Sequence, residues 1–91
     1  SFLELHTMHT YFVEMTDTFD GYANYSWVHR FKVSASSELG AIRKVTRETG
    51  YPARKEGDYG DCVVYNVPGA AIVYFVGLWD DEAEKHNYKT I

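Results

Sequence analysis

Residues 25–35 read YSWVHRFKVSA, and their side chains alternate between two kinds. The first set is aromatic or aliphatic apart from one histidine, and it comprises Tyr25, Trp27, His29, Phe31 and Val33. The second set contains the basic residues Arg30 and Lys32. Successive side chains of a strand point to opposite faces of a sheet. The stretch therefore predicts a long strand with an aromatic inner face and a basic outer face.

The segment before this strand predicts its hairpin partner. Residues 10–16 also alternate, with Tyr11, Val13 and Met15 on one face. The turn-rich residues 17–24 lie between the two strands, and Asp20-Gly21 is their strongest turn signal. We expect an antiparallel hairpin closed by a wide loop over residues 17–24. Residues 1–7 precede Met8 and are either a cloning remnant or native sequence, so we leave them out of the fold.

The segment after the strand predicts one amphipathic helix over residues 37–49. Ser36 or Ser37 is placed to cap its start, and Gly50 is placed to end it. The core-facing stripe is expected to consist of Leu39, Ile42, Val45 and Thr49. We expect this stripe to pack against a set of apolar strand residues, namely Trp27, Phe31, Val63 and Phe75.

Two further strands are expected near the C-terminus. Residues 61–67 alternate, and residues 70–78 are apolar almost throughout, which is typical of a buried strand. The order β-β-α-β-β predicts an α+β two-layer sandwich with a mostly antiparallel four-stranded sheet and one amphipathic helix. The single domain is expected over residues 8–79, and residues 80–91 are expected to form an acidic tail or a short helix.

The chain is rich in aromatic residues, which make up 16% of its 91 residues. One helix is about 10 Å wide and four strands span roughly 15–20 Å, so the helix leaves part of the sheet bare. We expect a homodimer to cover this surface, either through a free strand edge or through the outer sheet face around Phe12, Val28, Val64 and Tyr74. The alternative is a monomer in which the 17–24 loop and the tail fold over the sheet.

The net charge of −4 is unevenly distributed along the chain. The segments 1–27 and 56–91 are acidic, whereas residues 28–55 carry seven basic and two acidic side chains. A nucleic-acid-binding module is therefore an alternative function, disfavoured by the overall acidity. Its candidate binding residues are Arg30, Lys32, Arg43, Lys44 and Arg47, with Tyr22 and Tyr25 as stacking surfaces.

No catalytic motif is recognisable in the sequence. A second alternative is a small ligand-binding protein or enzyme around His29, with Tyr65 and Cys62 as further candidates. Asp17, Asp20 and Gly21 are more typical of a turn than of a calcium loop. We expect no metal and no cofactor.

Residues 11–28 and 59–70 resemble stretches of small uncharacterised proteins carried by phages, plasmids and other mobile elements. The resemblance covers about a third of the chain, and it implies an accessory protein acting on a host or element-encoded partner. Our main expectation is a non-catalytic protein that works through protein–protein contact. The single cysteine favours a cytoplasmic location, and no apolar run approaches the roughly 18 residues of a membrane span. We therefore expect no membrane partner.

Overall fold

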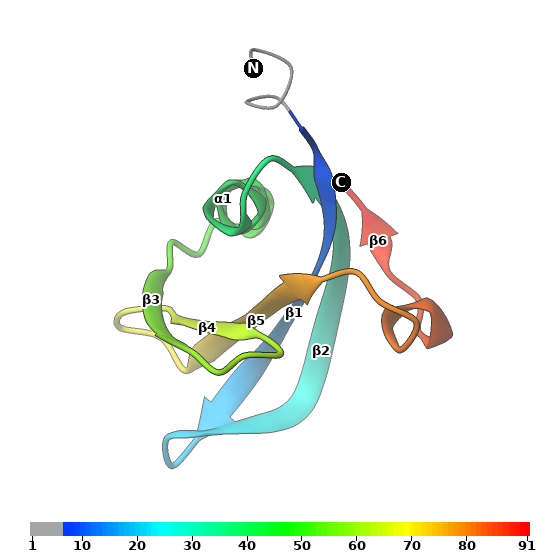
Figure 1. The fold of residues 1–91 in the computed structure, drawn as a ribbon. Coiled ribbons are helices and arrows are strands. Elements are labelled where there is room, and N and C mark those ends of the chain that lie inside the picture. The colour runs from blue at the N-terminus through cyan, green and yellow to red at the C-terminus, as the bar shows by residue number, and fades with distance from the viewer. Residues whose placement is uncertain (1–6) are drawn as a thin grey trace.

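The computed structural model describes residues 7–91, so most of the segment set aside above (1–7) lies outside the described residues. One α-helix packs against a curved sheet (Figure 1). The elements are β1 (His9–Phe19), β2 (Tyr22–Ala35), α1 (Glu38–Thr49), β3 (Arg54–Asp58), β4 (Val63–Asn66), β5 (Ile72–Leu78), the 3-10 helix η2 (Ala83–Lys85) and β6 (Lys89–Thr90). The predicted α+β class is confirmed.

The sheet is larger than the sequence predicts. It has six strands in the order β3-β4-β5-β1-β2-β6, and the pairing of β2 with β6 is parallel. The sheet is mostly antiparallel, as expected, but the expected number of four strands is wrong. Strand β3 reads RKEGD and has no apolar alternation, and β6 has only two residues. Both lie at sheet edges, where a strand needs no buried face of its own.

The hairpin of β1 and β2 is closed by a tight turn. Phe19 pairs with Tyr22, which leaves only Asp20 and Gly21 between the strands. Both turn residues have positive φ angles, 55° and 82°, as a two-residue hairpin turn requires. The expected wide loop over residues 17–24 is therefore wrong, because the two strands continue to the turn.

The helix begins and ends at the predicted residues. The side chain of Ser37 accepts a hydrogen bond from the Gly40 amide, and Gly50 ends the helix with a φ of 82°. The buried stripe consists of Ala41, Ile42 and Val45, whereas Leu39 is 46% exposed, so its predicted burial is wrong. At about 100° per residue, Leu39 lies roughly 110° from the centre of this stripe.

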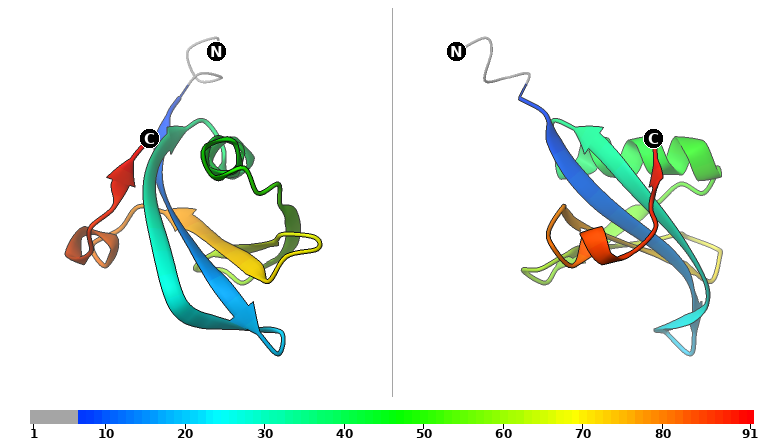
Figure 2. Two further views of the ribbon diagram at one scale, coloured as in Figure 1. Left: turned by 180° about the vertical axis from the view of Figure 1, so that it is seen from behind. Right: turned by 90° about the vertical axis from the view of Figure 1, so that its right-hand side faces the viewer.

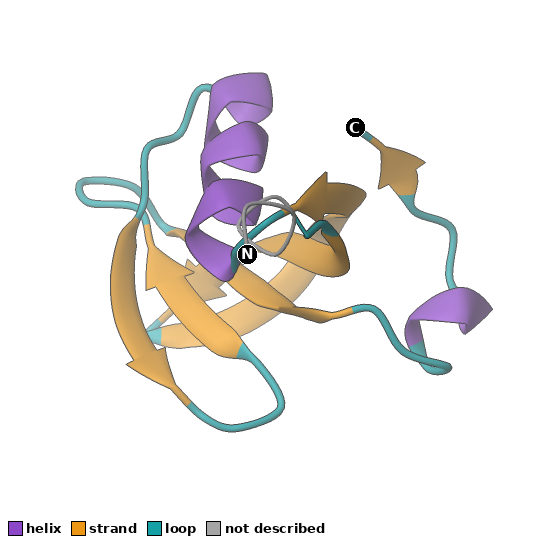
Figure 3. Cartoon of the chain, turned by 45° about the horizontal axis from the view of Figure 1, so that its top comes forward, coloured by secondary structure: helices purple, strands orange, loops and turns teal. Residues whose placement is uncertain are grey.

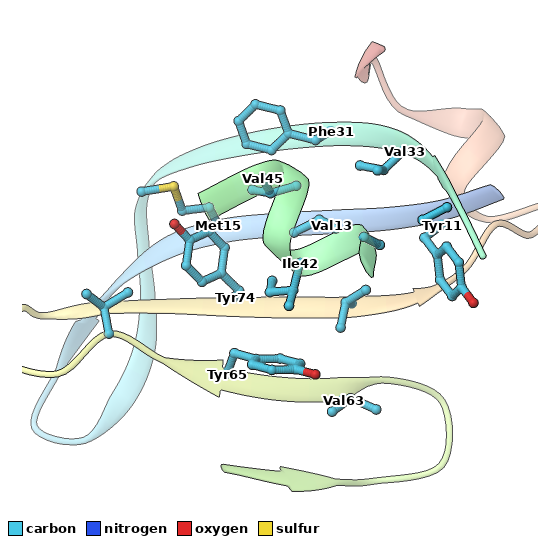
Figure 4. Close-up of a cluster of buried hydrophobic side chains, with 14 residues drawn as sticks. Tyr11, Val13, Met15, Phe31, Val33, Ile42, Val45, Val63, Tyr65 and Tyr74 are labelled. Atoms are coloured by element: carbon cyan, nitrogen blue, oxygen red, sulfur yellow. The ribbon is translucent and has the colours of Figure 1, made fainter. Parts of the chain in front are cut away.

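The core lies between α1 and the inner face of the sheet (Figure 4). Phe31 and Val63 belong to it as predicted, and Trp27 packs against it. Phe75 is on the opposite face, and Tyr74 points inward, where its hydroxyl lies 2.7 Å from the hydroxyl of Thr49. The predicted faces of these two residues are therefore exchanged, because a continuously apolar strand shows no alternation from which to read its faces.

The sheet and its covering continue beyond residue 79, where we expected the domain to end. Ala83 is buried, and it lines a pocket together with Phe12 and Glu14 on the outer face of β1. Figures 2 and 3 show this C-terminal segment on the far side of β1 and β2 from the helix. Part of the outer face proposed for a dimer is thus covered by the chain itself, and Val64 and Tyr74 are buried.

Candidate functional site

Strand β2 leaves part of one sheet edge without a partner. On the side away from β1, the pairing with β6 involves only Phe31 and Lys32. Within the described residues 7–91, no strand pairs with residues 26–30 on this side, and we call these five residues the open edge. Residues 21–29 contain no aspartate, glutamate, lysine or arginine. The open edge is therefore a hydrogen-bonding surface with almost no charge to repel an incoming strand.

A bend next to Asp17 sets one end of the open edge. One carboxylate oxygen of Asp17 accepts from the Ser26 amide at 2.9 Å, and the other accepts from the Ser26 hydroxyl at 2.6 Å and the Asn24 amide group at 2.8 Å. These hydrogen bonds lower the pKa of Asp17 to about 2. Tyr25 has a φ of 55°, and its ring stacks on Phe75. On the N-terminal side of Ser26, the chain thus turns away from the line of the open edge.

Beyond the bend, the hairpin ends in two exposed aromatic side chains. Phe19 is 75% exposed and Tyr22 is 77% exposed. They face each other across the Asp20-Gly21 turn at the tip of the hairpin, which extends below the sheet in Figure 1. Large aromatic side chains are enriched among the anchors of protein interfaces. The tip therefore adds apolar contact area near the open edge.

A groove separates the open edge from the last turn of α1. Its volume is about 300 Å³, and we call it the β2–α1 groove. Its lining combines buried apolar residues with polar and aromatic groups and comprises Met15, His29, Phe31, Glu48, Thr49, Tyr51 and Lys89. Figure 4 shows Met15 and Phe31 beside Val45 at the same part of the helix. An apolar floor with a polar rim suits a large, partly apolar side chain.

The chain's own C-terminal strand shows how a strand is held here. Lys89 pairs with Phe31, and the amide of Ile91 donates to the carbonyl of Lys32 at 3.0 Å. The Lys89 ammonium group reaches the carboxylate of Glu48 on α1 at 3.1 Å. Strand β6 therefore combines main-chain pairing along β2 with a side-chain contact to the helix.

The candidate basic residues are divided between the two sides of the sheet. Arg30 donates to Glu14 at 3.0 Å on the outer face, and the Lys32 ammonium group lies 4.4 Å from the centre of the Trp79 ring. The remaining three, Arg43, Lys44 and Arg47, are exposed on α1. Of the candidate stacking residues, Tyr22 is at the hairpin tip and Tyr25 lies over Phe75. These residues do not form one continuous basic surface.

The structure places two of the three candidate catalytic residues, His29 and Cys62, in different pockets. His29 lines the β2–α1 groove and lies against Trp27, with 5.4 Å between the ring centres. Cys62 lines a different pocket, together with Asp61. Burial raises the pKa of the Cys62 thiol, and Asp61 raises it further, so the reactive thiolate is disfavoured. The Tyr65 hydroxyl donates to Glu38 at 2.6 Å, with burial the main cause of its raised pKa.

Among residues 7–91, no three or more histidine, cysteine, aspartate or glutamate side chains are grouped closely enough to hold a metal ion. In this same part of the chain, no helix has the length and apolar character needed to cross a membrane.

Sequence reasoning placed the residues of the open edge in a strand but did not identify the edge. Pairing partners depend on strand order, which the alternation of residues 25–35 does not encode. The sequence contained one signal of the difference between the two edges. Residues 21–29 carry no charged side chain, whereas residues 54–58 are highly charged.

Comparison with protein-family models, curated proteins and solved structures finds no match.

Proposed function

We propose that the protein is a non-catalytic accessory protein that acts through protein–protein contact. The observation that carries this proposal is the open edge, an unpaired length of β2 whose one charged residue, Arg30, is paired with Glu14, beside the β2–α1 groove. Proteins bind extended segments by adding a strand to such an edge and receiving alternate side chains in adjacent pockets. The exposed Phe19 and Tyr22 at the hairpin tip support the same function.

The binding of β6 supports strand addition as the mode of contact. This short strand is held by main-chain pairing to β2 and by the ion pair of Lys89 with Glu48. The open edge continues the same line of β2 toward the hairpin tip. A partner strand placed there meets the same two surfaces, the edge and the helix.

The other two functions receive less support from the geometry. A nucleic-acid surface is not favoured, because Arg30 is engaged by Glu14 and the other candidate cations lie on different sides of the sheet. An enzyme around His29 is not favoured, because Cys62 lines a separate pocket. An origin in a mobile element and a cytoplasmic location stay predictions.

A photo-reactive amino acid placed along the sheet edges tests the proposal. The Val28 position reports on the open edge, and the Glu56 position on β3 is the matched control at the opposite edge. After irradiation of cells that express each variant, we expect protein adducts from the Val28 position and few from the Glu56 position. Equal labelling at both edges would contradict the proposal. Adducts that disappear after nuclease treatment would favour the nucleic-acid alternative instead.

A further inference from the structure

We infer that the open edge binds a second copy of this chain, through antiparallel pairing of the two β2 strands about a two-fold axis at Val28. This inference rests on the proposed function and names its partner. It follows from three features of β2, namely the length of the open edge, the direction of its backbone groups and the side chains on its two faces.

The length of the open edge is limited at both ends. The bend at Tyr25 directs the chain away toward Phe75, and β6 occupies β2 from Phe31 onward. Five residues, 26–30, therefore remain for pairing. When residues 26–30 pair in antiparallel fashion with residues 26–30 of the partner, Ser26 lies opposite the partner's Arg30 and Trp27 lies opposite the partner's His29. Val28, the central residue, therefore lies opposite the partner's Val28. The partner's strand bends away at its own Tyr25 before it would meet β6.

The backbone directions agree with this register. The carbonyl of Lys32 accepts from Ile91, so Lys32 directs its backbone groups away from β1. Backbone direction alternates along a strand, and Arg30 and Val28 therefore direct their amides and carbonyls outward as well. The Ser26 amide is already held by Asp17 at 2.9 Å. The Ser26 amide of each subunit is therefore not available for this pairing. The remaining backbone groups of the two edges form about four hydrogen bonds.

The inner faces are complementary in this register. The partner's Trp27 lies opposite His29, which lines the β2–α1 groove. The groove has a volume of about 300 Å³ and an apolar floor that includes Met15 and Phe31. The two-fold axis makes the contact reciprocal, so each subunit places an indole at the groove of the other.

The outer faces meet without a like-charge contact. Val28 lies beside the partner's Val28, and Arg30 lies opposite the partner's Ser26. The Arg30 side chain is already paired with Glu14 in its own subunit at 3.0 Å. The pairing therefore joins apolar to apolar and leaves this cation neutralised.

The other surfaces of the chain fit a second copy less well. The C-terminal segment covers part of the outer sheet face, and Ala83 is buried there. At the opposite edge, four of the five residues of β3 are charged. The open edge is the surface where pairing closes on itself without opposing like charges.

A disulfide at the two-fold axis tests the register. Residues in a hydrogen-bonded antiparallel pair have Cα atoms about 5.5 Å apart, a separation that suits a disulfide. In a Cys62→Ala background, we expect Val28→Cys to form a covalent dimer when an oxidant such as diamide is added. Glu56→Cys, on β3, is the matched control and is expected to stay largely monomeric. Cross-linking of Glu56→Cys as fast as Val28→Cys would overturn the inference.

Light scattering tests the dimer without cysteine chemistry. At roughly 100 µM, a concentration chosen for the micromolar affinity of a small interface, we expect twice the chain mass of 10.5 kDa. Val28→Lys places two ammonium groups on the axis and is expected to return the mass to that of one chain. A wild-type mass that stays at one chain would overturn the inference. In that case, the photo-cross-linking experiment at Val28 decides the proposed function. Adducts with a different protein would support the proposed function, and the absence of adducts would contradict it as well.

Discussion

The two edges of this sheet are built from opposite kinds of residues. Strand β3 has the sequence RKEGD and a register irregularity between Lys55 and Gly57. The β2 strand at the other side has no charged residue between positions 21 and 29 and carries exposed aromatics at its tip. Charges and bulges are devices by which natural sheets prevent pairing with other strands. Both sides have a register irregularity, since the pairing of β1 with β2 shifts between Thr16 and Thr18, so it is the difference in charge that indicates which edge is left available.

The open edge is protected from uncontrolled pairing by its short length. The bend near Tyr25 and the strand β6 restrict it to five residues. A short edge accepts a strand of defined register but gives little room for continued stacking of many chains. The two edges thus avoid aggregation differently, β3 by its charges and β2 by its limited length.

The largest effect is expected from the helix that supports the open edge. Helix α1 packs on β2, β1 and β5. Ile42 is 3% exposed in the core, and Ile42→Ala is expected to lower the free energy of unfolding by about 2–5 kcal/mol because it removes buried methyl groups and leaves a cavity. Urea unfolding measures the change.

Leu39→Ala is the matched control on the same helix. Leu39 is exposed, so we expect its truncation to change the free energy of unfolding by less than about 0.5 kcal/mol. A loss at Leu39 as large as that at Ile42 would mean that the helix face seen here is rotated.

The parts of the fold that follow from local patterns were predicted correctly. Helix α1 begins after Ser37 and ends at Gly50 because capping chemistry is local. The inner face of β1 was also read correctly, since one buried face imposes alternation on a strand. Strand β5 is covered on both faces, so the sequence around Tyr74 and Phe75 shows no alternation of apolar and polar residues that would distinguish the two faces.

The candidate site depended on non-local features. The open edge exists because β6 reaches only Phe31 and Lys32 and because Asp17 binds Ser26 nine residues away. The sequence identified Asp20-Gly21 as a turn but did not indicate that the strands continue to it. The separation of His29 from Cys62 likewise depends on strand order.

A smaller effect is expected from removing the charges of the β3 edge. Arg54 and Glu56 are exposed, and the double variant Arg54→Thr/Glu56→Val replaces both with residues that favour strands. We expect the mass measured by light scattering to rise more steeply with concentration than in the wild type. The rise is expected to be modest, because the irregularity between Lys55 and Gly57 remains.

The same comparison in a Val28→Lys background separates the two edges. With the open edge blocked, any increase in mass caused by Arg54→Thr/Glu56→Val comes from another surface. An unchanged mass in both backgrounds would show that charge is not what keeps the β3 edge from pairing.

The smallest effect is local and concerns the bend that ends the open edge. The Ser26 and Asn24 hydrogen bonds hold the pKa of Asp17 at about 2, below its ordinary value of 3.8. A lowered pKa means that the folded state favours the carboxylate, so its stabilising contribution is complete above about pH 3.8 and is lost as the pH falls through 2. We expect the NMR signal of the Ser26 amide proton to titrate with a midpoint near pH 2. Asp17→Asn removes the titrating group, so its Ser26 signal should stay flat from pH 4 to 2. A midpoint near 3.8 in the wild type would mean that these hydrogen bonds do not hold the bend in solution, and that the open edge is free to extend toward Tyr22.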